Sequence, residues 1–194
     1  MRDAQARLGR LDTVVLNAGY GLARLAELTS DADWLAILRT NLLRTAAGLR
    51  AAVPIMRGQE LRDGWRGQIM IVSSSLGRRA APDTAAYSAS KAAQLSLAEA
   101  ARVELAADRI MVTSVHPVRT TTPFFATCEQ TSGRAMEFRG RVPTQAPETV
   151  ARRMADAIER PRPEVWPHRL SRLLLLAACA WPSLADRIMA GHRR

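Results

Sequence analysis

Two rare residues of this chain, Tyr87 and Lys91, lie one helical turn apart. The chain has two tyrosines, and Lys91 is the single lysine among its 28 basic residues. Side chains four residues apart share one face of a helix, so we expect the phenol and the ammonium to be neighbours. A neighbouring ammonium stabilises a phenolate and lowers the pKa of the phenol from about 10, which makes it a better acid or base. The pair therefore indicates acid–base chemistry, and a lone lysine among arginines indicates a position that needs an ammonium.

Alternating strands and helices are predicted to hold this pair. Buried strands are expected at four short apolar runs, residues 11–16, 68–72, 109–115 and 163–166. Helices are expected between and after them, at residues 31–56, 83–107, 147–160 and 170–190, the last one interrupted by Pro182. Residues 120–146 are expected to be irregular, with one short helix. Continuous apolar strands separated by helices are typical of a parallel sheet covered on both faces. The predicted fold class is α/β, a doubly wound, Rossmann-like parallel sheet in a single domain over residues 1–194.

Polar residues lie at the carboxyl ends of three of the predicted strands. Asn17 follows the first strand, Ser74 the second, and His116 with Pro117 the third. In such sheets ligands bind beyond the carboxyl ends of the strands. We therefore expect these residues to meet at one edge of the sheet, next to the helix that carries Tyr87 and Lys91.

The stretch from Ile71 through Gly77, together with Tyr87-Ser-Ala-Ser-Lys-Ala-Ala93, resembles the active-site segment of the short-chain dehydrogenase/reductase family. Three further motifs agree in the right order: Asn17-Ala-Gly19, Asn41 in Thr-Asn-Leu-Leu, and the loop His116-Pro-Val-Arg-Thr-Thr-Thr122. The resemblance covers at least residues 8–125. It implies an NAD(P)-dependent oxidoreductase that interconverts an alcohol and a carbonyl of a small molecule by hydride transfer.

The resemblance also implies a role for each matched residue. Tyr87 is the general acid/base, and Lys91 lowers its pKa and holds the nicotinamide ribose. Ser74 hydrogen-bonds the substrate oxygen, although Ser73 and Ser75 flank it and the choice rests on spacing. Asn41 holds a water that links Lys91 to solvent. The residues expected to contact NAD or NADP are Asn17, Ala18, Gly19, Tyr87, Lys91, Pro117, Thr120 and Thr122.

The sequence departs from the family pattern in two places. The glycine-rich phosphate loop between a first strand and its helix is absent, and Val118 stands where the family has glycine. The chain begins just before the segment that resembles the family's fourth strand. Two βα units and a third strand, roughly 60 residues or more, would precede it in the family pattern. We expect either a longer native protein or an N-terminally truncated, non-catalytic fragment that serves as an interaction protein. The chain is then expected to bind cofactor weakly or not at all, and residues 11–16 to form an exposed apolar edge.

Composition excludes several other classes. The net charge is +10, but the arginines are spread along the chain without a basic block or a zinc-finger, homeodomain or RNA-binding signature, so nucleic-acid binding is not expected. Cys128 and Cys179 lie far apart, which argues against a structural zinc site and a disulfide framework. No metal site is predicted. The first ten residues are charged and do not resemble a signal peptide, so a cytoplasmic protein is expected.

The C-terminal segment, residues 170–194, is apolar and flanked by arginine. One interpretation is a helical segment that packs on the domain or on a second copy in a homo-oligomer. The other is a peripheral membrane contact through residues 170–190, or a lid over the substrate. Residues 124–146 would shape the substrate pocket and carry no pattern that names the substrate.

Overall fold

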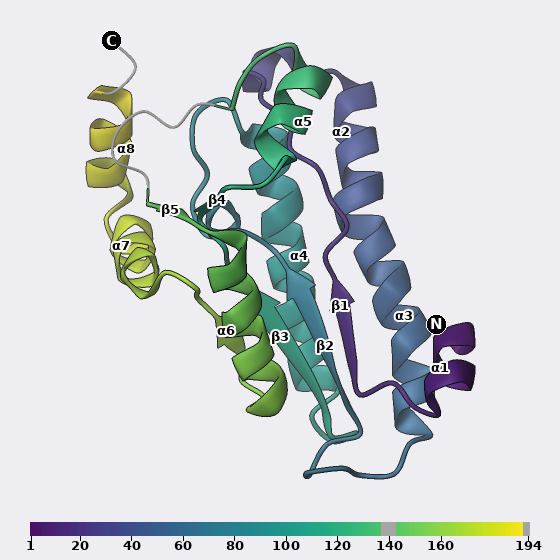
Figure 1. Ribbon diagram of the computed structural model, residues 1–194. Coiled ribbons are helices and arrows are strands. Elements are labelled where there is room, and N and C mark those ends of the chain that lie inside the picture. The colour runs from purple at the N-terminus through teal and green to yellow at the C-terminus, as the bar shows by residue number, and fades with distance from the viewer. Residues whose placement is uncertain (137–142, 192–194) are drawn as a thin grey trace.

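The chain folds into a four-stranded parallel sheet with helices on both faces (Figure 1). The computed structural model describes residues 1–136 and 143–191. Across the sheet the strands are, in order, β1 (Thr13–Leu16), β2 (Gly67–Val72), β3 (Ile110–Val115) and β6 (Glu164–Val165). The predicted α/β fold class is confirmed, and each predicted strand lies within two residues of the observed bounds.

The remaining elements lie between and around these strands. The helices are α1 (Arg2–Leu8), α2 (Asp31–Leu38), α3 (Arg44–Arg57), α4 (Ala85–Glu104), α5 (Phe124–Ser132), α6 (Pro147–Glu159), α7 (Arg169–Ala180) and α8 (Pro182–Gly191). Two 3-10 turns, η1 (Ala26–Leu28) and η3 (Ser75–Gly77), precede α2 and α4. A π-helical turn, η2 (Arg39–Leu43), joins α2 to α3, where the sequence predicts one continuous helix. Strands β4 (Arg119–Thr120) and β5 (Thr144–Gln145) form a separate parallel pair.

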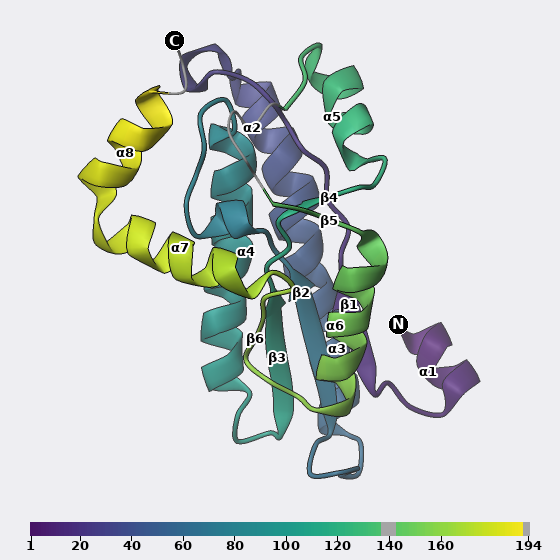
Figure 2. The same cartoon turned by 60° about the vertical axis from the view of Figure 1, so that its left-hand side comes forward.

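Alternate residues of β2 pack against opposite layers of helices. Ile69 and Ile71 belong to a buried cluster with α3 and α4, whereas Met70 and Val72 pack with Ala157 of α6. Successive side chains of a strand point to opposite faces of its sheet. Helices α3 and α4 therefore cover one face and α6 covers the other, as Figure 2 shows from the side. This arrangement leaves the carboxyl ends of β1, β2 and β3 together at one edge of the sheet.

Strand β1 lies at the edge of the sheet and pairs with β2 alone. Val15, in its middle, is 44% exposed. The predicted edge position of residues 11–16 is therefore confirmed, but their apolar side chains are exposed only in part: Leu11 is buried, and Val14 and Leu16 pack against the core. Helix α1, which the sequence analysis does not predict, precedes this strand and contributes no buried residue to the core.

The C-terminal segment forms two helices, as the position of Pro182 predicts. Helices α7 and α8 meet at an angle of 108°. Within the part of the chain that the structure describes, no single helix has the length and hydropathy needed to cross a bilayer. Helices α7 and α8 reach that limit only when they are counted together.

Candidate active site

A cavity of about 1220 Å³ lies at the carboxyl edge of the sheet. It is bounded by the residues that follow β1, β2 and β3, by the first half of α4, and by α7 and α8. Most of the predicted site residues line it: Asn17, Gly19, Ser74, Tyr87, Lys91, Pro117, Thr120 and Thr122. Ala18 and Asn41 are not among its lining residues.

Tyr87 lies in the first turn of α4, and its ring is buried between the cavity and α5. Its ring centroid is 5.6 Å from that of Phe124, and the side chain is 6% exposed. Burial raises the pKa of Tyr87 to about 12, although a hydrogen bond with the Ser74 side chain lowers it in part. In this state the phenol is protonated at neutral pH and can donate its proton.

Lys91 lies one turn further along α4 and is almost completely buried. Its Nζ donates to the main-chain oxygen of Val72 and to Oε1 of Gln94, both at 2.9 Å. An ammonium has three donors, so one proton is not used by these two bonds. Burial lowers the pKa of Lys91 to about 8, because the charged form loses its hydration.

The ammonium does not lower the pKa of Tyr87 below its ordinary value, contrary to the expectation from the sequence. Lys91 Nζ lies 5.9 Å from the centre of the Tyr87 ring and is directed to Val72 and Gln94. Desolvation of the phenol has the larger effect, and the pKa of Tyr87 rises instead. The helical spacing predicts that the two groups are neighbours, but it does not give the burial of either one.

The three consecutive serines after β2 have different surroundings. Ser73 Oγ donates to the main-chain oxygen of Lys91 at 2.7 Å and so ties β2 to α4. Ser74 Oγ accepts from the main-chain nitrogen of Leu76 and interacts with the phenol of Tyr87. Ser75 is the first residue of η3. Of the three, Ser74 is the serine that lines the cavity with Tyr87 and affects the pKa of its phenol, which fits the choice made from its spacing.

Asn41 is fully buried in the π-helical turn and acts on the backbone of the loop after β1. Its side-chain amide accepts from the nitrogen of Tyr20 and donates to the oxygen of Tyr20, both at 3.0 Å, and also donates to Ser90. Its main-chain oxygen accepts from Gln94 Nε2 at 2.6 Å and from Thr45 Oγ1 at 2.7 Å. A carbonyl oxygen has two lone pairs, so both are used by protein donors. Gln94 and Thr45 therefore bind the main-chain oxygen of Asn41, and the water expected at Asn41 stays a prediction.

The residues predicted to contact a cofactor lie on two loops beside Lys91. Asn17, Ala18 and Gly19 are exposed after β1. A Cβ atom on Gly19 would lie 3.0 Å from Asn41 Oδ1 and 3.5 Å from Lys91 Nζ, so the absence of a side chain keeps the approach to Lys91 open. On the second loop, Thr120 pairs with Gln145 of β5. Val118 does not have a positive φ, so this loop does not need glycine at that position.

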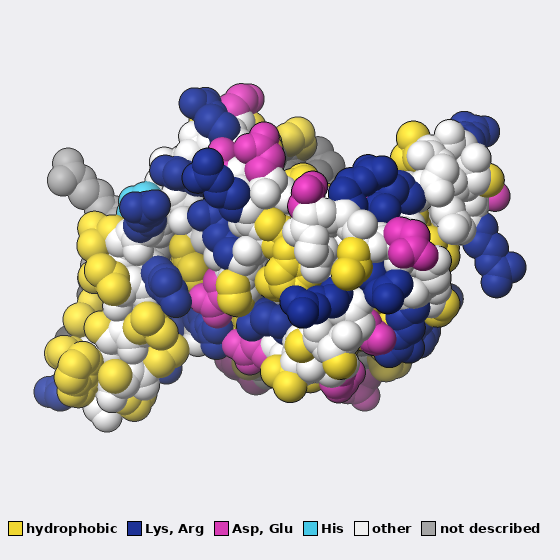
Figure 3. Space-filling model, turned by 90° about the horizontal axis from the view of Figure 1, so that it is seen from below, with side chains coloured by type: hydrophobic (Ala, Val, Ile, Leu, Met, Phe, Trp, Pro, Cys, Tyr) yellow, Lys and Arg dark blue, Asp and Glu magenta, His cyan; other side chains and the backbone are white. Residues whose placement is uncertain are grey.

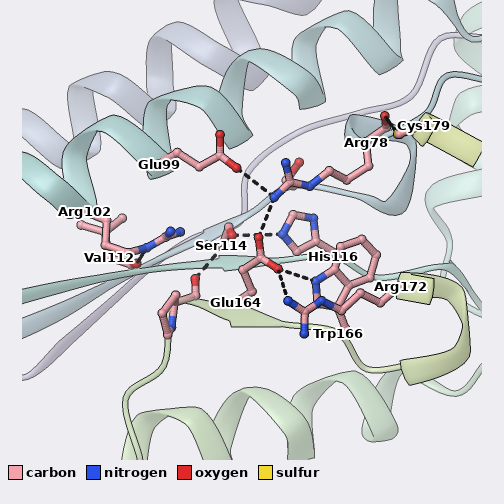
Figure 4. Close-up of polar contacts among 12 residues, drawn as sticks. Arg78, Glu99, Arg102, Val112, Ser114, His116, Glu164, Trp166, Arg172 and Cys179 are labelled. Atoms are coloured by element: carbon pink, nitrogen blue, oxygen red, sulfur yellow. Dashed lines mark hydrogen bonds and ion pairs between the residues drawn. The ribbon is translucent and has the colours of Figure 1, made fainter. Parts of the chain in front are cut away.

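His116, directly after β3, belongs to a buried polar cluster that the sequence analysis does not predict (Figure 4). Its ring stacks on Trp166 at 4.3 Å, and Nε2 lies 3.0 Å from Ser114 Oγ. Glu164 accepts from Trp166 Nε1 at 2.8 Å and from Arg78 at 2.6 Å. Within residues 1–136 and 143–191 no group of ligating side chains could hold a metal ion. The cluster joins β3, β6 and η3.

The buried imidazole of His116 is expected to make the fold sensitive to acid. Burial lowers the pKa of His116 to about 4, and the nearby Arg78 and Arg102 act in the same direction against Glu164. The unfolded chain binds this proton near pH 6.5, and the folded chain does so only near pH 4. Acidification between these values therefore favours unfolding, by about 1.4 kcal/mol per pH unit.

Unfolding in denaturant at pH 6.5, 6 and 5 measures this dependence. His116→Gln is expected to flatten it, and His168→Asn is the control, because His168 caps α7 and asparagine is also a good N-cap. An equal slope in wild type and His116→Gln would assign the acid sensitivity to other groups.

Comparison with known proteins identifies the family. A family model described as short chain dehydrogenase matches residues 1–133. The chain therefore belongs to the short-chain dehydrogenase/reductase family. An uncharacterized NAD-dependent oxidoreductase of Mycobacterium tuberculosis is 43% identical over 122 residues, which is 62% of this chain and 42% of that protein. A cyclopentanol dehydrogenase of Comamonas sp. is 37% identical over 118 residues, which is 61% of this chain and 45% of that enzyme. The chain spans less than half the length of these curated relatives.

Solved structures show the same architecture. A short chain dehydrogenase/reductase from Burkholderia phymatum in complex with NAD superimposes with a TM-score of 0.79 at 22% identity, over 95% of this chain and 70% of that chain. That similarity shows the fold alone. A short chain dehydrogenase from Burkholderia cenocepacia in complex with NADP has a TM-score of 0.74 at 26% identity, over 99% of this chain and 75% of that chain.

Proposed function

We propose that this chain carries the proton-transfer site of an NAD(P)-dependent oxidoreductase that interconverts an alcohol and a carbonyl. The observation that carries the proposal is the meeting of Ser74, Tyr87 and Lys91 around one cavity. The Ser74 side chain lowers the pKa of the Tyr87 phenol in part, and Lys91 Nζ lies within 6 Å of the Tyr87 ring. A hydroxyl that binds an oxygen and a phenol that protonates it are what reduction of a carbonyl requires.

The chain's own groups divide the work in the direction of reduction. Ser74 Oγ donates a hydrogen bond to the substrate oxygen and orients it. The Tyr87 phenol, protonated at neutral pH, gives its proton to that oxygen as negative charge develops on it. The ammonium of Lys91 stabilises the phenolate that remains. In oxidation the same groups act in reverse, with Tyr87 accepting the proton.

The residues around Lys91 fit the nicotinamide-ribose half of NAD or NADP. Lys91 has a proton not used by Val72 or Gln94, and Gly19 leaves the path to it open. Asn17, Pro117, Thr120 and Thr122 line the same cavity and would hold the cofactor beside it. The bound nicotinamide would donate or accept the hydride. An NAD-dependent relative and an NADP-bound structural neighbour support this pair of cofactors.

The walls of the cavity favour an apolar substrate. The lining includes Phe124 and Phe125 of α5, Leu174 and Leu175 of α7, and Ile188 of α8. Burial of apolar substrate surface against these side chains stabilises the complex by about 25 cal/mol for each Å² removed from water. We therefore propose a bulky, lipophilic alcohol or ketone as the substrate class.

The test is cofactor-dependent turnover of such substrates, followed by the absorbance of the reduced nicotinamide, with a parallel titration of NAD and NADP. The proposal requires turnover that depends on Tyr87. Absence of both turnover and cofactor binding would favour the alternative function, a non-catalytic interaction protein.

We further propose that helices α7 and α8 contact an anionic membrane surface. Figure 3 shows hydrophobic side chains gathered over the lobe that these helices form, with arginines beside them. The exposed large side chains on the two helices that do not line the cavity are Leu170, Leu173, Leu176, Trp181 and Leu184. The two helices carry more basic than acidic side chains, namely Arg169, Arg172 and Arg187 against Asp186. The net charge of the whole chain is +10. An apolar face flanked by arginine is typical of helices that lie in a membrane interface.

Sedimentation with anionic phospholipid vesicles checks this contact. Replacing Leu173 and Leu176 together by aspartate is expected to lower the bound fraction at least tenfold, because each exposed leucine contributes about 1–2 kcal/mol when it leaves water. Leu35→Asp with Leu61→Asp is the matched control on exposed leucines elsewhere. Light scattering without vesicles gives the number of copies. A complex of two copies that is lost in the α7 variant, with no vesicle binding by wild type, would assign this face to self-association.

We also propose a cytoplasmic homo-oligomer. Strand β1, at the edge of the sheet, offers its outer side to another chain. Cys128 and Cys179 are both free, which fits a reducing compartment.

A further inference from the structure

Gln94 is a fully buried polar residue of α4 that lies next to the candidate active site. It is three residues after Lys91, which places both side chains on one face of the helix. Its Oε1 accepts from Lys91 Nζ at 2.9 Å. Its Nε2 donates to the main-chain oxygen of Asn41 at 2.6 Å and to Thr45 Oγ1 at 2.8 Å. The amide therefore joins the ammonium on α4 to the π-helical turn between α2 and α3.

The surroundings allow one orientation of this amide. Rotation by 180° would turn its NH₂ group toward the ammonium of Lys91 and its oxygen toward the oxygen of Asn41. Two donors would then face each other at one end and two acceptors at the other, inside a buried region where unpaired polar groups are costly. The amide oxygen is thus held against Nζ by bonds formed at the other end of the same group.

We propose that Gln94 is a positioning residue that keeps the Lys91 side chain charged and directs its remaining proton toward the cavity. This proposal rests on the proposed function, in which that ammonium serves Tyr87 and the cofactor ribose. Two neutral acceptors, the oxygens of Val72 and Gln94, stabilise the ammonium in a site that disfavours charge. A hydrogen bond to the charged form raises the pKa of a lysine, so loss of the Gln94 oxygen shifts Lys91 toward the neutral amine.

The single lysine of the chain makes this measurable without any activity. Labelling with [ε-¹³C]lysine gives one side-chain carbon signal from Lys91, and its shift against pH reports the ionisation of that amine directly. Gln94→Met removes the acceptor at similar volume and is expected to increase the acid dissociation constant of Lys91 about tenfold, since hydrogen bonds to charged groups are among the stronger ones. Gln94→Glu places a carboxylate at the same distance and is expected to change that constant at least tenfold in the opposite direction.

Gln68→Met is the matched control. Gln68 is a second buried glutamine, and it bonds Thr113 and the main-chain oxygen of Ala157 on the other side of the sheet, away from Lys91. This variant is expected to leave the titration of Lys91 as in wild type. If Gln94→Met does not fold, Gln94→Leu removes the same acceptor at similar volume and carries the test, because Gln94→Glu places a carboxylate oxygen against the main-chain oxygen of Asn41. A titration of Lys91 that either folded Gln94 variant leaves unchanged overturns the proposal.

The titration and the turnover of the enzyme separate this proposal from the proposed function. In an active preparation, Gln94→Met is expected to move the pH profile of kcat in the same direction and by the same factor as the carbon signal. A purely structural role would lower activity at every pH without moving the profile. A shifted carbon signal in a protein that turns over no substrate would contradict the proposed function and leave the link between Gln94 and Lys91 intact.

Discussion

Tyr87→Phe is expected to reduce oxidoreductase turnover about 10³-fold and leave the fold unchanged. General acid–base catalysis contributes about 10²–10⁴-fold to an enzyme rate. Only the hydroxyl is removed, and the ring keeps its contact with Phe124 in the buried cluster. Steady-state rates of wild type and variant, with a denaturation curve for each, measure both effects.

The second tyrosine supplies the control for this substitution. Tyr20 is held by the side chain of Asn41 through its main-chain atoms, so Tyr20→Phe keeps these bonds. We expect this variant to retain wild-type turnover. If Tyr87→Phe kept more than a tenth of the rate, another group would have to deliver the proton, and the role proposed for Tyr87 would be wrong.

Local sequence patterns carry enough information for the main parts of this site. The spacing of Tyr87 and Lys91 needs only a helix to make them neighbours, and the structure has that helix. Ser74 is found because it lies two residues after the end of a strand of six buried residues. Parallel strands bring their carboxyl ends to one edge, which is why residues from distant parts of the chain meet there.

The missing parts of the prediction depend on contacts between segments far apart in sequence. Gln94 is three residues after Lys91, but its other partners, Asn41 in the π-helical turn and Thr45 in α3, are 53 and 49 residues away, so no local pattern singles it out. The π-helical turn that presents Asn41 interrupts a segment whose apolar pattern reads as one helix. The pKa of Tyr87 rises because the ring is buried next to Phe124 of α5, and the sequence does not predict that α5 packs there.

In the fold, too, local patterns predict some elements, whereas others depend on contacts between distant segments. Strands β2 and β3 are long and apolar, and hydrophobic pattern alone is enough to find them. The pair β4 and β5 has two residues in each strand, so it exists through its tertiary pairing and leaves no periodicity to read. Part of the loop expected to shape the substrate pocket, residues 137–142, lies outside the described residues.

Gly77 in η3 is the glycine whose replacement is expected to disturb this site most. A Cβ atom there would lie 2.8 Å from Ser73 Oγ and 2.9 Å from the main-chain oxygen of Lys91. The second of these atoms belongs to the backbone of α4, which cannot rotate away as a flexible side chain can. Gly77→Ala must therefore separate η3 from α4, and with it Ser74 from Tyr87.

We expect Gly77→Ala to lower the free energy of unfolding by about 2–3 kcal/mol, in the range of overpacked core sites, and to reduce turnover because Ser74 moves with η3. Gly58→Ala is the matched control: Gly58 has φ −79°, and the nearest atom to its added Cβ is 3.6 Å away. That change is expected to stay within about 0.5 kcal/mol of wild type or to stabilise slightly, by restricting the unfolded chain. Equal free energies of unfolding for the two variants would mean that η3 can move away from α4 without a loss of stability. The contact with α4 would then not hold Ser74 in place.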